Sequence, residues 1–220
     1  RTTDGAVFLQ DSADDLIIGS TQASSEVVAA DSSITVNAVA PLSGIVSGGA
    51  DASIVVTQTT GSINSIAPVS AAGSGNILLD AAGALALNAD VSSGSGNITL
   101  IGTSGVSLAS SVTAQTAGTG TIDVSSLEGG LTMATDSSIT ALDGDVVVET
   151  SEDVILGDIT TSSRVNITSQ LGSVSSASLG NNTLVGGSIS FDSETGIGRT
   201  GAGKLRLDTA LLDFTNASGS

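Results

Sequence analysis

The chain repeats a short pattern in which two aliphatic residues flank one variable residue, as in Ile98-Thr99-Leu100. Because successive side chains of a β-strand point to opposite faces, this alternation predicts a short strand with one buried and one solvated face. Neighbouring copies begin 16 to 27 residues apart and about 22 on average, a spacing typical of repeat proteins. The copies are Val7/Leu9, Ile34/Val36, Ile54/Val56, Ile77/Leu79, Ile98/Leu100, Ile122/Val124, Val146/Val148, Val165/Ile167, Ile189/Phe191 and Leu205/Leu207.

A second aliphatic pair follows the first after eight or nine residues in most copies, as in Val106/Leu108. A third aliphatic residue follows in several copies, for example Val91 and Val112. Each period therefore holds two short strands and, in several copies, a third, with Gly, Asn, Asp or Ser between them. Helices are disfavoured, because Gly and β-branched residues occupy the positions where a helix needs Ala, Leu, Glu or Lys.

Two adjacent stretches show the repeat clearly: residues 73–91 read GSGNILLDAAGALALNADV and residues 94–112 read GSGNITLIGTSGVSLASSV. A shift of 21 positions superimposes their glycines and aliphatic residues, so that Val112 is expected to stack on Val91. One turn buries too few aliphatic side chains to offset the entropy cost of ordering it, whereas stacked turns cover each other's apolar layers.

These patterns predict an all-β fold, a right-handed parallel β-helix (β-solenoid) of about ten turns of roughly 22 residues; the handedness follows the general rule for parallel crossover connections. Leucine-rich repeats have a similar period, but their L-x-x-L-x-L and Asn positions are missing. A β-sandwich should show turns every 8 to 12 residues or so without the longer period.

Residues 1–220 are expected to form a single β-helix segment of a longer repeat protein. The long step after Val7, and a Pro and a Gly pair in the stretch 39–50, predict a loop insertion at residues 39–50. Residues 215–220 are expected to form a frayed tail. The sequence contains no amphipathic capping helix at either end, so we expect either further repeats of the same chain or self-association of copies end to end.

The amino-acid composition excludes several classes of partner and site for this chain. Hydrophobic residues make up 40% but aromatic residues only 1%, so the apolar content suits thin aliphatic layers rather than a core built on large rings. The net charge of −17 argues against nucleic acid and anionic membrane surfaces as partners. The apolar runs are too short for membrane insertion, and the absence of Cys excludes disulfides and thiolate metal sites.

Repeats such as GSGNITLIGTSGVSLASSV, GTIDVSSLEGGLTMATDSSI and GDVVVETSEDVILGDI, with AVFLQDSADDLIIGS near the start, resemble the repeat regions of filamentous-haemagglutinin-like and autotransporter-type bacterial surface adhesins. The similarity is one of repeat pattern over nearly the whole chain and brings no catalytic motif. It implies an exported, extracellular or cell-surface bacterial protein, in which the segment acts as a rigid stalk, fibre-forming unit, adhesin or biofilm component. A host, cell-surface or matrix component would be its partner.

An enzyme on a β-helix needs clustered carboxylates with His, Lys, Arg or Tyr on neighbouring turns. This chain has no His or Tyr and five basic residues. We therefore expect a non-enzymatic protein without catalytic or cofactor-binding residues. The alternative is a polysaccharide-binding or polysaccharide-cleaving module, whose basic cluster would be Arg199, Lys204 and Arg206 near three acids; those acids are Asp192, Glu194 and Asp208.

Two acidic clusters raise the question of calcium, because hard cations need several converging oxygens. Most of these acids are expected to be solvated at corners, with no metal site; a calcium site at Asp143 and Asp145 is the alternative. The clusters comprise Asp11, Asp14 and Asp15, and Asp143, Asp145, Glu149, Glu152 and Asp153.

The middle residues of the first strands should face water, yet several of them are apolar, among them Val55, Leu78 and Val147. Contiguous exposed apolar surface usually contacts a partner, whereas scattered single residues need no explanation. Both interpretations stay open for this column. A binding function would therefore be sought in outward residues and in residues 39–50, since the repeated aliphatic residues build the core.

Overall fold

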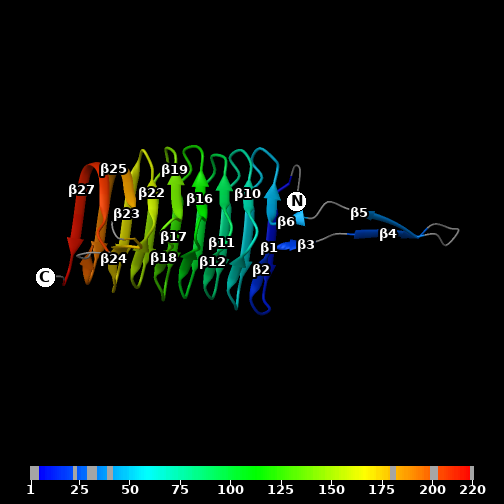
Figure 1. The fold of residues 1–220 in the computed structure, drawn as a ribbon, viewed down its shortest axis with the longest axis horizontal. Helices are drawn as coiled ribbons and strands as arrows, with labels where there is room; N and C mark the ends of the chain where they lie inside the picture. The colour runs from blue at the N-terminus through cyan, green and yellow to red at the C-terminus, as the bar shows by residue number, and fades with distance from the viewer. Residues whose placement is uncertain are drawn as a thin grey trace.

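In the computed structural model the chain forms an elongated all-β parallel solenoid whose coils stack along one axis (Figure 1). The structure describes residues 5–21, 24–28, 34–38, 42–178, 182–198 and 203–218. Each coil has three strand-bearing sides, named face 1, face 2 and face 3 in chain order. The bends between them are corners 1–2, 2–3 and 3–1.

Strands on the same face pair in parallel with the strands of the coils before and after. Face 1 consists of β1 (Val7–Asp11), β8 (Ile54–Gln58), β11 (Ile77–Ala81), β14 (Ile98–Gly102), β17 (Ile122–Ser126), β20 (Val146–Thr150), β23 (Arg164–Ser169) and the second halves of β25 (Thr183–Ser193) and β27 (Arg206–Asn216). Face 2 consists of β2 (Leu16–Ile18), β9 (Ile63–Ser65), β12 (Leu85–Leu87), β15 (Val106–Leu108), β18 (Leu131–Met133), β21 (Val154–Leu156), β24 (Ser173–Ser176) and β26 (Gly196–Ile197). Face 3 consists of β7 (Ile45–Ser47), β10 (Val69–Ala71), β13 (Val91–Ser93), β16 (Thr113–Thr116), β19 (Ser138–Ala141), β22 (Asp158–Thr160) and the first halves of β25 and β27.

The core is a set of aliphatic columns that run along the solenoid axis. On face 1, Ile98 pairs with Ile77 before it and Ile122 after it, and all three side chains are buried. Each inward side chain thus packs on the equivalent side chain of the preceding coil, as the 21-residue shift predicts. Stacking departs from that shift on face 3, where Val91 pairs with Ala114 and not with Val112. The corner before β16 is longer than the one before β13, and Val112 is buried within it.

The solenoid has about seven turns, fewer than the ten predicted. Two copies of the aliphatic pattern account for most of the difference. Ile34 and Val36 lie in a hairpin outside the coils. Leu207 pairs with Leu184 on face 3, so Leu205 and Leu207 do not begin a new coil.

An antiparallel hairpin leaves the solenoid between β2 and β7 and projects beyond its N-terminal end (Figure 1). It comprises β4 (Ser24–Val28) paired with β5 (Ile34–Ala38), and at its base β3 (Ser20–Thr21) paired with β6 (Leu42–Ser43). Of the stretch 39–50, residues 39–41 lie outside the described residues, and 45–47 form β7 on face 3. Of the stretch 215–220, residues 215–216 end β27 and 219–220 are not described.

Corners are built by glycines and small hydroxyl side chains. Several inward Ser and Thr residues at strand ends donate to backbone carbonyls of the turns, for example Ser93 to Gly75 at 2.8 Å and Ser169 to Glu152 at 2.7 Å. These bonds satisfy turn carbonyls that lie outside the strand ladders. Among the described residues there is no helix long and apolar enough to cross a membrane.

Candidate functional site

A ladder of polar side chains runs along corner 3–1, just before each face 1 strand. Here an oxygen of one coil accepts the backbone N–H of the next: Asn76 Oδ1 from Asn97 at 2.8 Å, and Asn97 Oδ1 from Thr121 at 2.9 Å. Parallel ladders are interrupted where the chain bends, and these side chains pair N–H groups that the bend would leave without a partner. The Asn and Asp residues of the corners therefore have a structural role.

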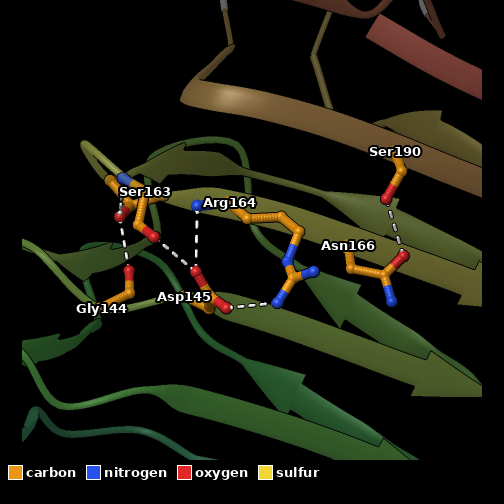
Figure 2. A network of polar contacts seen from close by, with 7 residues as sticks. Gly144, Asp145, Ser163, Arg164, Asn166 and Ser190 are labelled. Atoms are coloured by element: carbon orange, nitrogen blue, oxygen red, sulfur yellow. Dashed lines mark hydrogen bonds and ion pairs between the residues drawn. The ribbon is translucent and has the colours of Figure 1, made fainter. Parts of the chain in front are cut away.

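Asp145 occupies this ladder position two coils further on and makes the most contacts of the series (Figure 2). Its Oδ1 accepts the Ser163 hydroxyl at 2.5 Å and the Arg164 backbone N–H at 3.1 Å. Its Oδ2 accepts Arg164 Nη2 at 2.7 Å, forming an ion pair. The hydrogen bond from Ser163, with those from Arg164, lowers the pKa of the Asp145 carboxyl below its usual range.

We expect Asp145→Asn to destabilise the solenoid at pH 7 by up to about 1 kcal/mol, because the ion pair is solvent-exposed. A lowered folded-state pKa adds stability that is present above the unfolded-state pKa and lost as pH falls through the folded value. The difference between wild type and variant should therefore shrink below about pH 4. Urea unfolding from pH 7 to pH 2.5 measures it.

Arg164→Gln and the double variant complete this comparison as a mutant cycle. The coupling between Asp145 and Arg164 should be positive at pH 7 and vanish at the acidic end of the series. A coupling that persists when the carboxyl is protonated would contradict the ion-pair explanation.

The fold disperses the second of the two predicted acidic clusters, whereas the first stays together at the end of β1 and the corner after it. Asp11 Oδ2 accepts Gln58 Nε2 at 2.9 Å, and Asp15 Oδ1 accepts the Ser62 N–H at 2.8 Å, so both acids brace the first coil. The second cluster spreads over one face and two corners: Asp143 and Asp145 lie at corner 3–1, Glu149 lies on face 1, and Glu152 and Asp153 lie at corner 1–2. In the described ranges no group of three or more Asp or Glu residues is placed to hold a metal ion.

The predicted basic cluster is only partly described, because Arg199 lies outside the described residues. Lys204 lines a hollow at the C-terminal end, and Arg206 begins β27 on face 3, beside Thr183. Glu194 lies beyond the end of β25, at corner 1–2. The structure thus places Lys204 and Arg206 around the start of face 3, away from the corner that carries Glu194.

The outward column of face 1 begins with an apolar strip, in which Phe8 pairs with Val55 and Val55 with Leu78. Val147 is separated from this strip by two polar residues. In coil order the column reads Phe8, Val55, Leu78, Thr99, Asp123, Val147, Asn166, Ser190 and Asp213.

Two side chains in this column are affected by their neighbours. Partial burial, with the charge of Glu149 nearby, raises the pKa of Asp123. Ser190 donates to Asn166 Oδ1 at 2.9 Å (Figure 2).

At the described ends of the solenoid, apolar side chains are exposed in inward columns whose members are buried in the central coils. At the N-terminal end, Leu9 is 48% exposed and lines a hollow of about 450 Å³ with Leu16, Ile18 and Ile45. At the C-terminal end, Phe214 is 65% exposed and lines a hollow of about 560 Å³ with Ile197, Leu207 and Leu212.

Sequence reasoning foresaw open edges but not these two hollows. The C-terminal hollow had a signal in the sequence, the alternating apolar pair Leu212/Phe214.

Several Asn, Asp and Ser side chains of the corners are thus engaged in hydrogen bonds. Large apolar side chains are exposed at the two described ends and also along the sides, at Ile66, Leu127, Leu142 and Leu171. Compared with known protein families, with curated proteins and with solved structures, the chain finds no significant match.

Proposed function

We propose that this chain is a non-enzymatic, rigid spacer segment of an exported bacterial surface or extracellular-matrix protein. The observation that carries the proposal is the unbroken parallel pairing on all three faces, from β1 to β27 on face 1 and through every coil between them. In such an array each coil contacts only the coils before and after it. The number of coils therefore sets the length of the rod, and the hydrogen-bonded strand ladders give it stiffness.

The aliphatic columns support this role physically. Central inward residues such as Leu100, Leu131 and Val154 are fully buried between the coils before and after. Bending or shearing the solenoid would open these layers and break ladder hydrogen bonds at the same time. A net charge of −17 keeps the sides of such a rod soluble and mutually repelling.

Export and surface location are proposed from the resemblance to haemagglutinin-like repeats. A cysteine-free chain is compatible with an oxidising exterior, where stray thiols would cross-link. Adhesion to a host, cell-surface or matrix component would use the exposed sides, with the apolar strip Phe8–Val55–Leu78 as one such surface.

The spacer proposal predicts that whole coils can be removed in register. Deleting residues 98–145 takes out the two coils that begin with β14 and β17 and joins Asn97 to Val146, at the same corner position. Because the strand spacing is about 4.8 Å, the variant should stay folded and shorten by about 10 Å. Small-angle X-ray scattering measures the length, and circular dichroism measures the retained strand content.

The matched control deletes residues 98–133, which ends half-way through a coil and joins corner 3–1 to corner 2–3. That variant should lose cooperative unfolding. If the in-register deletion unfolds as readily as the control, or leaves the length unchanged, the chain is not a modular spacer.

A further inference from the structure

A groove runs along the solenoid axis where corner 1–2 meets face 2, with further coils both before and after it. It extends over four successive coils, from Ala84 to Ile155, and has a volume of about 410 Å³. Because neighbouring strands lie about 4.8 Å apart, four coils cover about 14 Å along the axis. About four residues of an extended chain cover the same distance. The groove therefore has the length of a short extended peptide.

The floor of the groove consists of glycines and small hydroxyl residues. Gly105 and Gly130 come directly before β15 and β18, whose outward residues are Ser107 and Thr132. Gly105 has a φ of +134°, which side-chain-bearing residues rarely adopt. A Cβ on Gly130 would press against the carbonyl oxygen of Asp153. Both glycine positions therefore exclude larger residues, and this keeps the floor low.

Two backbone N–H groups of residues that line the groove, Gly130 and Asp153, have no hydrogen-bond acceptor within the described part of the chain. The carbonyl oxygens of the same two residues are engaged, since they accept the N–H groups of Val106 at 3.0 Å and Leu131 at 3.1 Å. Backbone N–H groups are strong donors, so both are available to an acceptor on a ligand. The carbonyl oxygen of a peptide is such an acceptor.

Corner 1–2 borders the groove with a ridge of two leucines and two acids, Leu127, Glu128, Glu152 and Leu171. The leucines are 68% and 71% exposed, and the Leu171 N–H donates to the Ser151 carbonyl at 2.9 Å, next to Glu152. Among the described residues neither ridge glutamate has an ion-pair or hydrogen-bond partner for its carboxylate. Lys and Arg pack their aliphatic stems on apolar surface and keep their charged heads free for a carboxylate. The ridge therefore suits basic side chains.

The charges at this corner favour a cationic partner. At corner 3–1 the carboxylate of Asp145 is paired with Arg164, whereas no described Lys or Arg lies at corner 1–2. A second copy of this chain is a poor partner, because its five basic and 22 acidic residues make two copies repel each other.

We propose that the groove and the ridge bind an extended, basic peptide segment of a partner protein. Carbonyl oxygens of the segment accept the N–H groups of Gly130 and Asp153. Its Lys or Arg side chains lie on the ridge leucines and reach the ridge carboxylates. The inference goes beyond the spacer role, which its failure would leave intact.

Fluorescence anisotropy of the full chain tests the proposal with a dye-labelled octapeptide of four alternating Arg-Thr pairs, blocked at both ends. At about 150 mM salt, where exposed charges are screened beyond about 8 Å, we expect saturable binding with a Kd below about 1 mM. Spermine carries four positive charges but no carbonyl group, so it should compete at least tenfold more weakly than the unlabelled octapeptide. Equal competition by spermine, or no binding of the octapeptide, would overturn the proposal.

A pair of double variants separates the ridge from the general negative charge of the chain. Glu128→Gln with Glu152→Gln should weaken octapeptide binding at least fivefold, because each removes a carboxylate from the site. The matched control is Asp80→Asn with Asp192→Asn, which removes two outward carboxylates of face 1 and changes the net charge equally. The control should change the Kd less than twofold. Equal effects would show attraction to the whole surface and contradict a site at corner 1–2.

Uncharged changes test the groove and the ridge leucines separately. Thr132→Trp fills the groove and should weaken binding at least tenfold, whereas Thr140→Trp, outward on face 3, should change it less than twofold. Leu127→Ser should weaken binding at least threefold, and Leu142→Ser, at a leucine 55% exposed on corner 3–1, less than twofold. Circular dichroism checks that each variant is folded. Unchanged binding by folded Thr132→Trp would exclude the groove as the site, and unchanged binding by Leu127→Ser would exclude the ridge.

Discussion

Leu100→Ala is expected to lower the free energy of unfolding by about 3 kcal/mol, within the range measured for buried large-to-small changes. Leu100 has no exposed surface and lies in register between Leu79 and Val124. Its removal leaves a void that faces two apolar layers, and the ladders on both sides keep those layers from collapsing into it. Urea unfolding followed by circular dichroism measures the loss.

The matched control is Thr99→Ala, on the same strand with its side chain outward. It should change the free energy of unfolding by less than about 0.5 kcal/mol, as most surface changes do. If the two variants were equally destabilised, the inward and outward assignment of face 1 would be wrong.

The second large effect concerns the glycines of corner 3–1. Gly75, Gly96, Gly120 and Gly144 occupy equivalent positions, and a Cβ on any of the last three would press against the carbonyl oxygen of the preceding glycine. That oxygen is backbone, so it cannot move aside without shifting a whole coil. Gly120→Ala is therefore expected to destabilise the solenoid by about 2 to 3 kcal/mol, as overpacking of a tight core does.

Gly19→Ala serves as the control, because its Cβ would make ordinary contact with the Ile66 side chain at 3.5 Å. That change should be neutral or slightly stabilising, since alanine reduces the freedom of the unfolded chain. Thermal unfolding of both variants separates the two cases. Equal melting temperatures would show that corner 3–1 can widen, and would remove the packing reason for its glycines.

The inward aliphatic columns could be predicted because their cause is local. Ile77 and Leu79 alternate with outward residues, and the same alternation returns at Ile98 and Leu100 after one circuit. An alternation of period two predicts a strand, and its return at nearly constant spacing predicts the stack.

Counting turns required information that the pattern lacks. Ile34 and Val36 alternate like any solenoid strand, yet they pair antiparallel within the hairpin. Leu207 follows the same pattern but lies on face 3. Alternation of apolar and polar residues predicts that one side of a strand is buried. It does not predict which other strand covers that side.

The acids of the second cluster are close in sequence but not in space, for a related reason. Asp145 and Asp153 are close in sequence, but the straight strand β20 lies between them and carries them to different corners. Asp145 and Arg164 are 19 positions apart and form an ion pair, because one circuit returns the chain to the same corner. In a solenoid, neighbours in space are one period apart in sequence.

The residue pattern alone therefore specifies strands, the inward columns and the stacking principle, since each depends on side-chain alternation within a few residues and on one repeated spacing. The folded arrangement alone specifies which face each strand joins and where the hairpin leaves the solenoid. Those features depend on the lengths of the corners summed along the chain.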